Sequence, residues 1–379
     1  MPENIRVEGD SFSMHNDAIL VLRGISKRYG KNIAVDDFTL EVQRGEFVTI
    51  LGESGAGKST LLKIIAGMIC PDSGNIILLG DDITNQPSHK RPFAMVFQSY
   101  ALFPHMSVRE NLAFPLRRMR RFGRQQIYEK VREICSLLGI QALEHRMPNQ
   151  LSGGQQQRVA LGRALLKVLN NQSGVGQAVL LMDEPLSSID KNLRQAMQAE
   201  IKRLQKQLGL TILYVTHEQT EALSMSDRVV LIRSGRILQV ERPAHLYEKP
   251  ATRYVANFFG LSNLLTGRLA DSKSTNIVLP DGTNLCIPPV DYLAGESVEI
   301  LVHPEKLSFT PLNNAHVNKI KVQVIDCYYL GSQLVFLTRT RTGQEFQVRQ
   351  LNVSTQHLPT IGDTATVYWR VEDTVVVKS

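Results

Sequence analysis

The stretch from Gly52 to Thr60 reads GESGAGKST and directly follows the apolar run FVTIL. An apolar strand, a glycine-rich turn and a helix start, in that order, are typical of a phosphate-binding loop. Its glycines leave room for backbone N–H groups to close around a polyphosphate, and the following helix adds its positive dipole end. Lys58 then places a charge on the β- and γ-phosphates, and the Ser59 hydroxyl is a ligand for Mg²⁺. The chain is therefore predicted to bind a nucleoside triphosphate.

A second apolar segment, VLLMDE at 179–184, ends in two carboxylates. Asp183 at the end of this expected strand can hold Mg²⁺ opposite Ser59. Glu184 is the candidate general base for an attacking water. Two acids after a buried strand are equally consistent with an ordinary loop start, and the phosphate-binding loop favours the catalytic interpretation.

Two further apolar strands end in polar side chains: TILYVTH ends at His217 and AMVFQ at Gln98. In a parallel sheet whose ligand crevice lies at the carboxyl ends of the strands, His217 would face the γ-phosphate. The Gln98 amide would contact Mg²⁺ or the attacking water. Taken alone, each residue is also consistent with a strand cap or a surface position.

The segment LSGGQQQR at 151–158 precedes a helical run. Ser152 is predicted to be an N-cap, and the amides of Gly153 and Gly154 open a second helix N-terminus suited to an anion. The chain thus has two such helix starts but one Lys-bearing loop. A two-fold dimer in which the Ser152 turn of each copy covers the γ-phosphate of the other would use both.

These segments, with SSID at 187–190, occur in the order and approximate spacing of an ATP-binding cassette (ABC) transporter ATPase, over about residues 18–250. The resemblance implies an α/β fold with a P-loop NTPase core at 18–255 and a helical subdomain at about 99–160. It also implies ATP and Mg²⁺ as ligands, a homodimer, and two integral-membrane permease subunits as partners. A solute-binding protein would be an indirect partner, and the chain would be peripheral on the cytoplasmic face of the inner membrane.

The resemblance further implies roles for single residues. Tyr29 would stack on adenine, His217 would be a γ-phosphate switch, and Gln98 would sense the γ-phosphate and begin the segment that touches the membrane subunits. Asp190 would couple the two sites across the dimer. The implied nucleotide contacts are Tyr29, Gly52, Glu53, Ser54, Gly55, Ala56, Gly57, Lys58, Ser59, Thr60 and Gln98. From the opposite copy they are Ser152, Gly153, Gly154, Gln155 and Asp190. The implied metal ligands are Ser59, Gln98 and Asp183, and the catalytic residues are Glu184, His217, Gln98 and Lys58.

The chain departs from the family pattern at three places. Glu53 stands where many members have Pro, and Ile189 where Leu is usual; neither side chain needs to touch nucleotide. The stretch at 169–177 is longer than the turn of the family, and we interpret it as a surface loop extension.

The pattern changes to strands and turns after Gly260, with hairpin signals DG at 281–282 and TG at 342–343. Residues 295–302 are matched by 362–369, and a Glu follows each copy, at Glu305 and Glu372. The two similar units predict a small OB-like β-barrel at 262–379, which resembles the C-terminal TOBE-type domain of importer ATPases. Trp369 is predicted to be a core residue. Residues 1–17 are polar and expected to be flexible.

The net charge is +7, and part of it is local, because five arginines lie between 117 and 124. A solvated charged face is the first interpretation of this cluster and contact with anionic lipid headgroups the second. Nucleic-acid binding is not expected, since a single aromatic, Phe122, lies among these arginines. No segment has the ~18–20 uninterrupted apolar residues of a membrane span. Four widely spaced cysteines are expected to be reduced, buried thiols without zinc.

The transported solute is a separate question. The segments QSYALFPHM at 98–106, YLGS at 329–332 and VED at 371–373 resemble spermidine/putrescine import ATPases. ATPases importing iron(III), sulfate or sugars share much of this pattern and remain alternatives. A soluble ABC ATPase acting on nucleic acid is an alternative from another class, and the C-terminal domain is also compatible with a regulatory sensor. Residues 100–106, taken as an exposed aromatic-rich run, are the expected permease contact.

Overall fold

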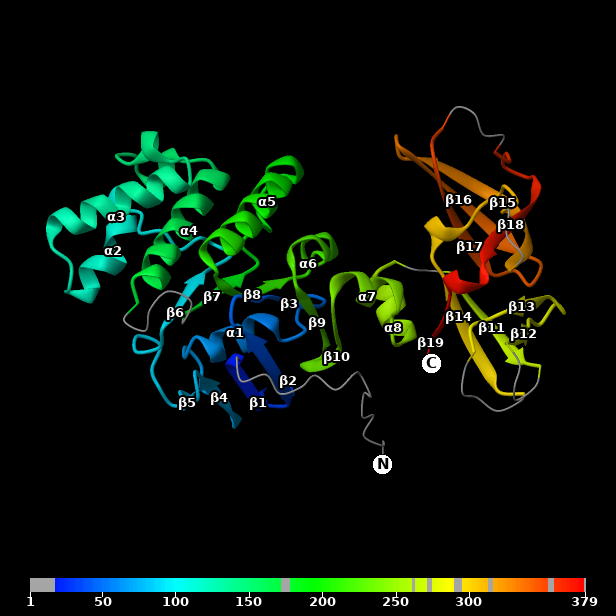
Figure 1. Ribbon diagram of the computed structural model, residues 1–379, viewed down its shortest axis with the longest axis horizontal. Coiled ribbons are helices and arrows are strands. Elements are labelled where there is room, and N and C mark those ends of the chain that lie inside the picture. Colours follow the sequence, from blue (N-terminus) through cyan, green and yellow to red (C-terminus); the bar gives the residue numbers. More distant parts are fainter. Residues whose placement is uncertain are drawn as a thin grey trace. The chain divides into compact units, whose positions relative to one another are not determined.

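The computed structural model describes residues 18–171, 178–260, 263–270, 275–289, 295–312, 316–353 and 358–377. The chain divides into two compact units, one ending at Pro243 and the other beginning at Ala244 (Figure 1). The predicted flexible segment 1–17 and most of the loop extension at 169–177 lie outside the described residues.

A six-stranded, mostly parallel sheet forms the centre of the first unit. Its order is β10 (Arg236–Glu241), β9 (Arg228–Arg233), β3 (Phe47–Leu51), β8 (Thr211–Thr216), β7 (Val179–Asp183) and β6 (Phe93–Val96), with only β10 antiparallel. Successive residues of β7 enter opposite cores: Val179 and Leu181 face one, Leu180 and Met182 the other. Burial on both faces explains why these strands are nearly continuous apolar runs.

One face of this sheet is covered by α1 (Lys58–Ile65) and by a second, antiparallel sheet. The strands of that sheet, in spatial order, are β2 (Asn32–Gln43), β1 (Ala18–Tyr29), β4 (Ser73–Leu78) and β5 (Asp81–Asp82). The sequence indicated strands in this region but not that they leave the central sheet.

The other face is covered by helices, which include the predicted helical subdomain. These are α2 (Val108–Met119), α3 (Arg124–Leu137), η1 (Gln141–Leu143), η2 (Pro148–Gln150), α4 (Gly153–Leu169), α5 (Lys191–Leu208) and α6 (Gln219–Met225). Ser107 caps α2 and Ser152 caps α4, each within a capping box completed by Glu110 or Gln155. The predicted N-cap at Ser152 is therefore confirmed.

The second unit contains two sheets that share one apolar core. One has the order β13 (Asn284–Cys286), β12 (Asn276–Val278), β11 (Leu264–Leu269), β14 (Ser297–Val302) and β19 (Thr374–Val377). The other has the order β17 (Glu345–Leu351), β16 (Gln333–Thr340), β15 (Val317–Tyr329) and β18 (Thr364–Arg370). Trp369 is fully buried and donates a hydrogen bond to Thr374, which confirms it as a core residue.

The internal repeat corresponds to a repeated structure. Strand β14 leads into η3 (Pro304–Lys306), and β18 leads into η4 (Val371–Asp373). The two repeat glutamates, Glu305 and Glu372, each lie in the short helix that follows the strand. Both predicted hairpins also form, between β12 and β13 and between β16 and β17.

Two short helices, α7 (Pro243–Glu248) and α8 (Arg253–Phe258), contact the rest of the second unit. The Tyr247 hydroxyl donates to Glu305, the Tyr247 carbonyl lies 2.8 Å from His303 Nε2, and Arg253 lies 3.2 Å from the Glu299 carboxylate. The division after Pro243 therefore differs from the sequence-based boundary at 255–262.

All four cysteines are free, but their burial differs from the expectation. Cys135 is buried and Cys327 partly buried, whereas Cys70 and Cys286 are exposed. The prediction of buried thiols is thus wrong for those two. Among the described residues, none of the helices combines the length and apolar character needed to cross a membrane.

Candidate nucleotide-binding site

The parallel register brings the predicted site residues to one edge of the central sheet. Leu51 at the end of β3 pairs with Thr216 of β8, and Asp183 of β7 pairs with Val215 of β8. Val96 at the end of β6 pairs with Met182 of β7. The segments that follow these strand ends, including the phosphate-binding loop, therefore begin side by side.

The phosphate-binding loop surrounds the side chain of Lys58, the first residue of α1. Its ammonium is buried and donates to the carbonyls of Gly52 at 2.9 Å and Glu53 at 2.8 Å. Burial lowers the pKa of Lys58, and the nearby Glu184 carboxylate opposes that effect. Gly57 has φ of 99°, and a Cβ there would lie 1.9 Å from the Ala34 carbonyl oxygen, so the loop requires glycine.

Ser59 and Asp183 meet beside this loop. The Ser59 hydroxyl donates to the Asp183 carboxylate at 2.8 Å. Burial raises the pKa of Asp183, and the Ser59 hydrogen bond acts in the opposite direction. A hydroxyl and a buried carboxylate are hard oxygen donors, and a divalent cation would compensate the buried negative charge. The pair fits Mg²⁺, which typically takes few protein ligands and completes its shell with phosphates and water.

Glu184 occupies a strained position between two other site residues. Its φ is 44°, an uncommon value for a residue with a side chain, and its N–H donates to the Val215 carbonyl at 2.9 Å. One carboxylate oxygen lies 3.0 Å from His217 Nδ1, and the other 3.8 Å from Lys58 Nζ. Such strain is maintained only where the surroundings impose it, and it aims this carboxylate at the phosphate-binding loop.

Gln98 and Tyr29 lie at the periphery of this cluster. Gln98 is exposed and follows β6 at the same sheet edge. Tyr29 ends β1, is 50% exposed, and pairs with Asn32, the first residue of β2. Two residues further along β2, Ala34 lies against Gly57. The ring of Tyr29 is thus presented on a hairpin that packs on the phosphate-binding loop.

The segments predicted to act on a second copy lie together. Ser152 and Gly153 are exposed, and so is Asp190, which caps α5 by accepting from the Leu193 N–H at 3.0 Å. A Cβ at Gly154 would lie 2.5 Å from the Leu193 side chain, so α4 and α5 begin in close contact. The Ser152 turn and the Asp190 turn therefore form one exposed surface.

Residues 100–106 are less exposed than expected. Tyr100 is buried, and its hydroxyl lies 2.7 Å from Ser188 Oγ, while Phe103 is partly buried against Phe114 with ring centroids 4.6 Å apart. The interpretation of this run as an exposed aromatic surface is wrong for Tyr100. The Phe103 ring packs instead against Phe114 of α2 in the helical subdomain.

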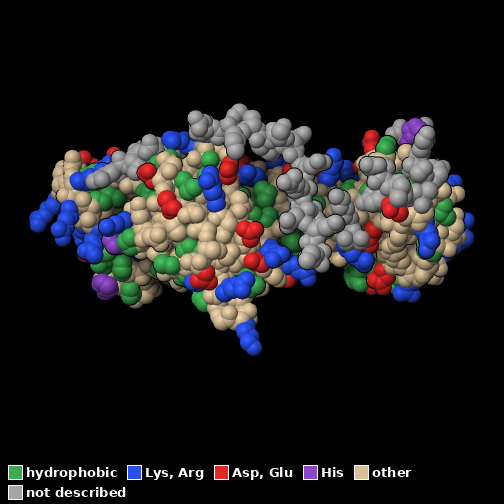
Figure 2. All heavy atoms as spheres, turned by 90° about the horizontal axis from the view of Figure 1, so that it is seen from below, with side chains coloured by type: hydrophobic (Ala, Val, Ile, Leu, Met, Phe, Trp, Pro, Cys, Tyr) green, Lys and Arg blue, Asp and Glu red, His purple; other side chains and the backbone are tan. Residues whose placement is uncertain are grey.

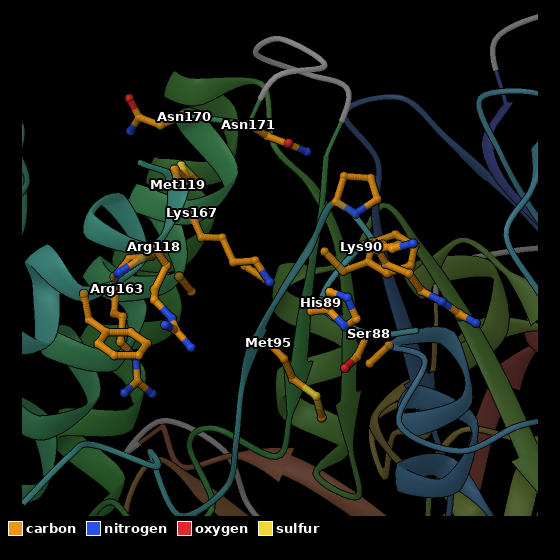
Figure 3. Close-up of a pocket in the computed structure, with 18 of the residues that line it drawn as sticks. Ser88, His89, Lys90, Met95, Arg118, Met119, Arg163, Lys167, Asn170 and Asn171 are labelled. Atoms are coloured by element: carbon orange, nitrogen blue, oxygen red, sulfur yellow. The ribbon is translucent and has the colours of Figure 1, made fainter. Parts of the chain in front are cut away.

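A groove of about 750 Å³ lies beside this run, between the segment around β6 and helices α2 and α4 (Figure 3). Every charged or ionisable side chain in its lining is basic, and no carboxylate is among the described lining residues. The basic side chains are His89, Lys90, Arg91, Arg118, Arg121, Arg163 and Lys167. In Figure 3, Lys167 extends from its helix toward the space opposite His89 and Lys90.

Three of these arginines donate to backbone carbonyls, and the first, Arg121, donates to the carbonyl of Asn170. Arg91 is buried and donates to the carbonyls of Gln86, Thr84, Ile64 and Ile65, the last two at the end of α1. Arg163 donates to the carbonyls of Tyr100 and Ala101. Nothing in the sequence pattern singled out Arg91 or Arg163. Figure 2 shows Lys and Arg side chains gathered at the end of the molecule that holds α2 and α3, where Arg117, Arg118, Arg120, Arg121 and Arg124 are exposed.

The sheet, the phosphate-binding loop and the acidic strand end define a P-loop ATPase with a C-terminal all-β domain. Comparison with known proteins narrows this class. The ABC transporter family model matches residues 35–187, and the TOBE domain model matches residues 300–377.

Individual relatives agree. The chain is 44% identical over 325 residues to the spermidine/putrescine import ATP-binding protein PotA of Haemophilus influenzae, covering 85% of each chain. It is 42% identical over 364 residues to PotA of Thermobifida fusca, covering 94% of this chain and 92% of that one. The dimeric cassette MJ0796 bound to ADP and Pi superposes with a TM-score of 0.51 at 28% identity, covering 59% of this chain and 98% of that chain. The chain belongs to the family of ABC importer ATP-binding subunits, which are ATPases coupled to transport.

Proposed function

We propose that this chain hydrolyses ATP as a homodimer at the cytoplasmic face of the inner membrane, and so drives uptake of a polyamine through two separate permease subunits. A solute-binding protein would deliver the polyamine. The observation that supports the ATPase most directly is the cluster of Lys58, Ser59, Asp183, Glu184 and His217 at one sheet edge. The names of the relatives, spermidine/putrescine import ATP-binding proteins, support a polyamine as the transported solute.

Each residue of the cluster has a proposed task. Lys58 and the amides of the loop hold the β- and γ-phosphates, and Tyr29 stacks on adenine. Ser59 and Asp183, with Gln98, hold Mg²⁺, which when bound neutralises phosphate charge. Glu184 accepts a proton from the water whose oxygen attacks the γ-phosphorus as the bond to ADP breaks. His217 orients the Glu184 carboxylate.

The second copy completes each site in this proposal. The exposed surface of the Ser152 and Asp190 turns presents a helix N-terminus and backbone amides of Gly153 and Gly154, which suit the γ-phosphate of a partner. The dimeric cassette among the structural relatives supports this arrangement. ATP would join the two copies, and hydrolysis would separate them.

The permease would dock in the groove between β6 and the helices α2 and α4. Seven cationic or ionisable side chains line the groove, and three arginines among them donate to backbone carbonyls. Charge complementarity therefore favours a docking segment with carboxylates. The groove wall includes Arg91, which binds the end of α1, so the docked segment would lie next to the helix that begins at the phosphates.

Uptake of radiolabelled spermidine tests the solute. A strain lacking this gene is expected to lose uptake, and plasmid-borne parental chain, but not Glu184→Gln, is expected to restore it. Unchanged uptake in the deletion strain would remove the polyamine from the proposal. Phosphate release by the purified chain tests the ATPase separately from the solute.

A further inference from the structure

Arg194 joins the two turns that flank the proposed catalytic residues. It lies on α5, one helical turn after Asp190, and its Nη2 donates to the Ile189 carbonyl at 3.0 Å. Its Nη1 donates to the Glu218 carboxylate at 2.9 Å. Glu218 directly follows His217, and that carboxylate oxygen lies 4.0 Å from His217 Nε2. One guanidinium thus spans the Asp190 turn and the His217 turn.

The backbone of the His217 turn is fixed on its other side by a buried carboxylate. The Glu218 N–H donates to the Thr216 hydroxyl at 3.0 Å, and that hydroxyl donates to Glu221 at 2.8 Å. The Tyr214 hydroxyl donates to the same Glu221 oxygen at 2.8 Å. Glu221 is 1% exposed, and a buried carboxylate is tolerated only with such donors. The turn is therefore anchored at Thr216, and the Glu218 side chain is its attachment to Arg194.

We propose that Arg194 is a positioning residue, which transmits the position of the Asp190 turn to His217 through Glu218. The proposal rests on the proposed function, in which the Asp190 turn faces a second copy and His217 orients Glu184. The side chains of Ser188 and Asp190 are exposed, whereas Ile189 is buried between them. A shift of this turn on contact with the second copy moves the Ile189 carbonyl. The planar, two-point guanidinium then carries Glu218 with it.

The chain contains a matched control pair on the same helix. Lys202 of α5 lies 2.8 Å from Asp227, which follows α6 by two residues, so this pair also joins α5 to the region of α6. The Lys202 side chain is 20% exposed, close to the 21% of the Arg194 side chain. Lys202→Ala removes an ion pair of nearly equal length, 2.8 Å against 2.9 Å, without touching the His217 turn.

The experiment measures phosphate release against ATP concentration for Arg194→Glu, Glu218→Arg, their double variant, Arg194→Lys and Lys202→Ala. Each single charge reversal is expected to lower kcat about tenfold or more, since small misplacements of catalytic groups have effects of up to ~10²-fold. The KM should change less than about twofold, and the Hill coefficient for ATP should fall toward one. The double variant restores the ion pair and should recover kcat in part, but not cooperativity, because a carboxylate at position 194 cannot donate to the Ile189 carbonyl. Arg194→Lys, which keeps a donor, should recover part of both, and Lys202→Ala should match the parent.

A double variant no more active than the single ones would overturn the proposal. So would an equal loss in Lys202→Ala, because the loss would then come from destabilising α5 in general. Melting temperatures of all variants distinguish a loss of positioning from a general destabilisation of α5. A parental chain that fails to hydrolyse ATP would refute the proposed function and this inference together. An active parent with an equally active Arg194→Glu would refute the inference alone.

Discussion

Replacing Glu184 by Gln removes the proposed general base while disturbing the site very little. The side chain keeps its shape, and the amide can still contact His217 Nδ1, which lies 3.0 Å from the carboxylate. The backbone at φ 44° and its hydrogen bond to the Val215 carbonyl do not depend on the charge. The substitution therefore tests proton acceptance rather than folding.

The expected magnitude follows from the chemistry and from the neighbouring charges. General-base catalysis contributes about 10²–10⁴-fold, so kcat should fall by that factor, equivalent to roughly 3–5 kcal/mol of barrier. Lys58 loses a carboxylate 3.8 Å away but gains nothing that competes with phosphate. Removing a negative charge beside the polyphosphate should leave ATP affinity unchanged or increase it.

Phosphate release at saturating ATP measures the first effect, and titration with a fluorescent ATP analogue measures the second. Glu129→Gln, which changes an exposed carboxylate on α3, is the matched control and should behave like the parent. Hydrolysis by Glu184→Gln within about twofold of the parental rate would refute the assignment of the base.

Three other predictions concern the stacking of Tyr29 on adenine, the N-cap of α4 at Ser152 and the basic groove beside β6. Tyr29→Ala should weaken ATP binding roughly 5- to 150-fold, the equivalent of a stacking contact of about 1–3 kcal/mol, whereas Tyr29→Phe should bind normally in a fluorescence titration. Ser152→Ala and Ser107→Ala each remove an N-cap and should lower unfolding free energy by about 1 kcal/mol in urea titrations, yet only Ser152→Ala should also abolish most ATPase activity. Equal activities would contradict a role of Ser152 beyond capping. Lys167→Glu in the groove should reduce co-purification of the permease subunits, while Arg124→Glu, an equal charge change outside the groove, should not.

Much of the site could be predicted because its residues follow the ends of apolar strands. Parallel register alone brings Lys58, Asp183, Glu184 and His217 to one edge, so the strand pattern and the order of motifs were sufficient. The N-cap at Ser152 could also be predicted from local sequence, because a capping box is specified by residues three positions apart.

Features that depend on distant segments could not be predicted in the same way. Strand β1 pairs with β2 through a short hairpin, but it also pairs with β4, where Leu20 lies opposite Leu78, far along the chain. Periodicity shows that a strand exists but not which sheet it joins. Residues 100–106 were expected to be exposed because they form an aromatic-rich run in an otherwise polar segment, yet the Tyr100 hydroxyl reaches Ser188, 88 residues away. Arg194 and Glu218 meet only because α5 and the His217 turn pack together.

The central claim is that each ATP lies between the phosphate-binding loop of one copy and the Ser152 turn of the other. Sedimentation velocity tests it on Glu184→Gln with ATP and Mg²⁺, alone and combined with Ser152→Glu, which would set a negative charge against the γ-phosphate of the partner. The account predicts a species of twice the 42.5 kDa chain mass for the first protein and a single-chain species that still binds ATP for the second. Dimers of both proteins, or a single-chain species of both, would contradict it.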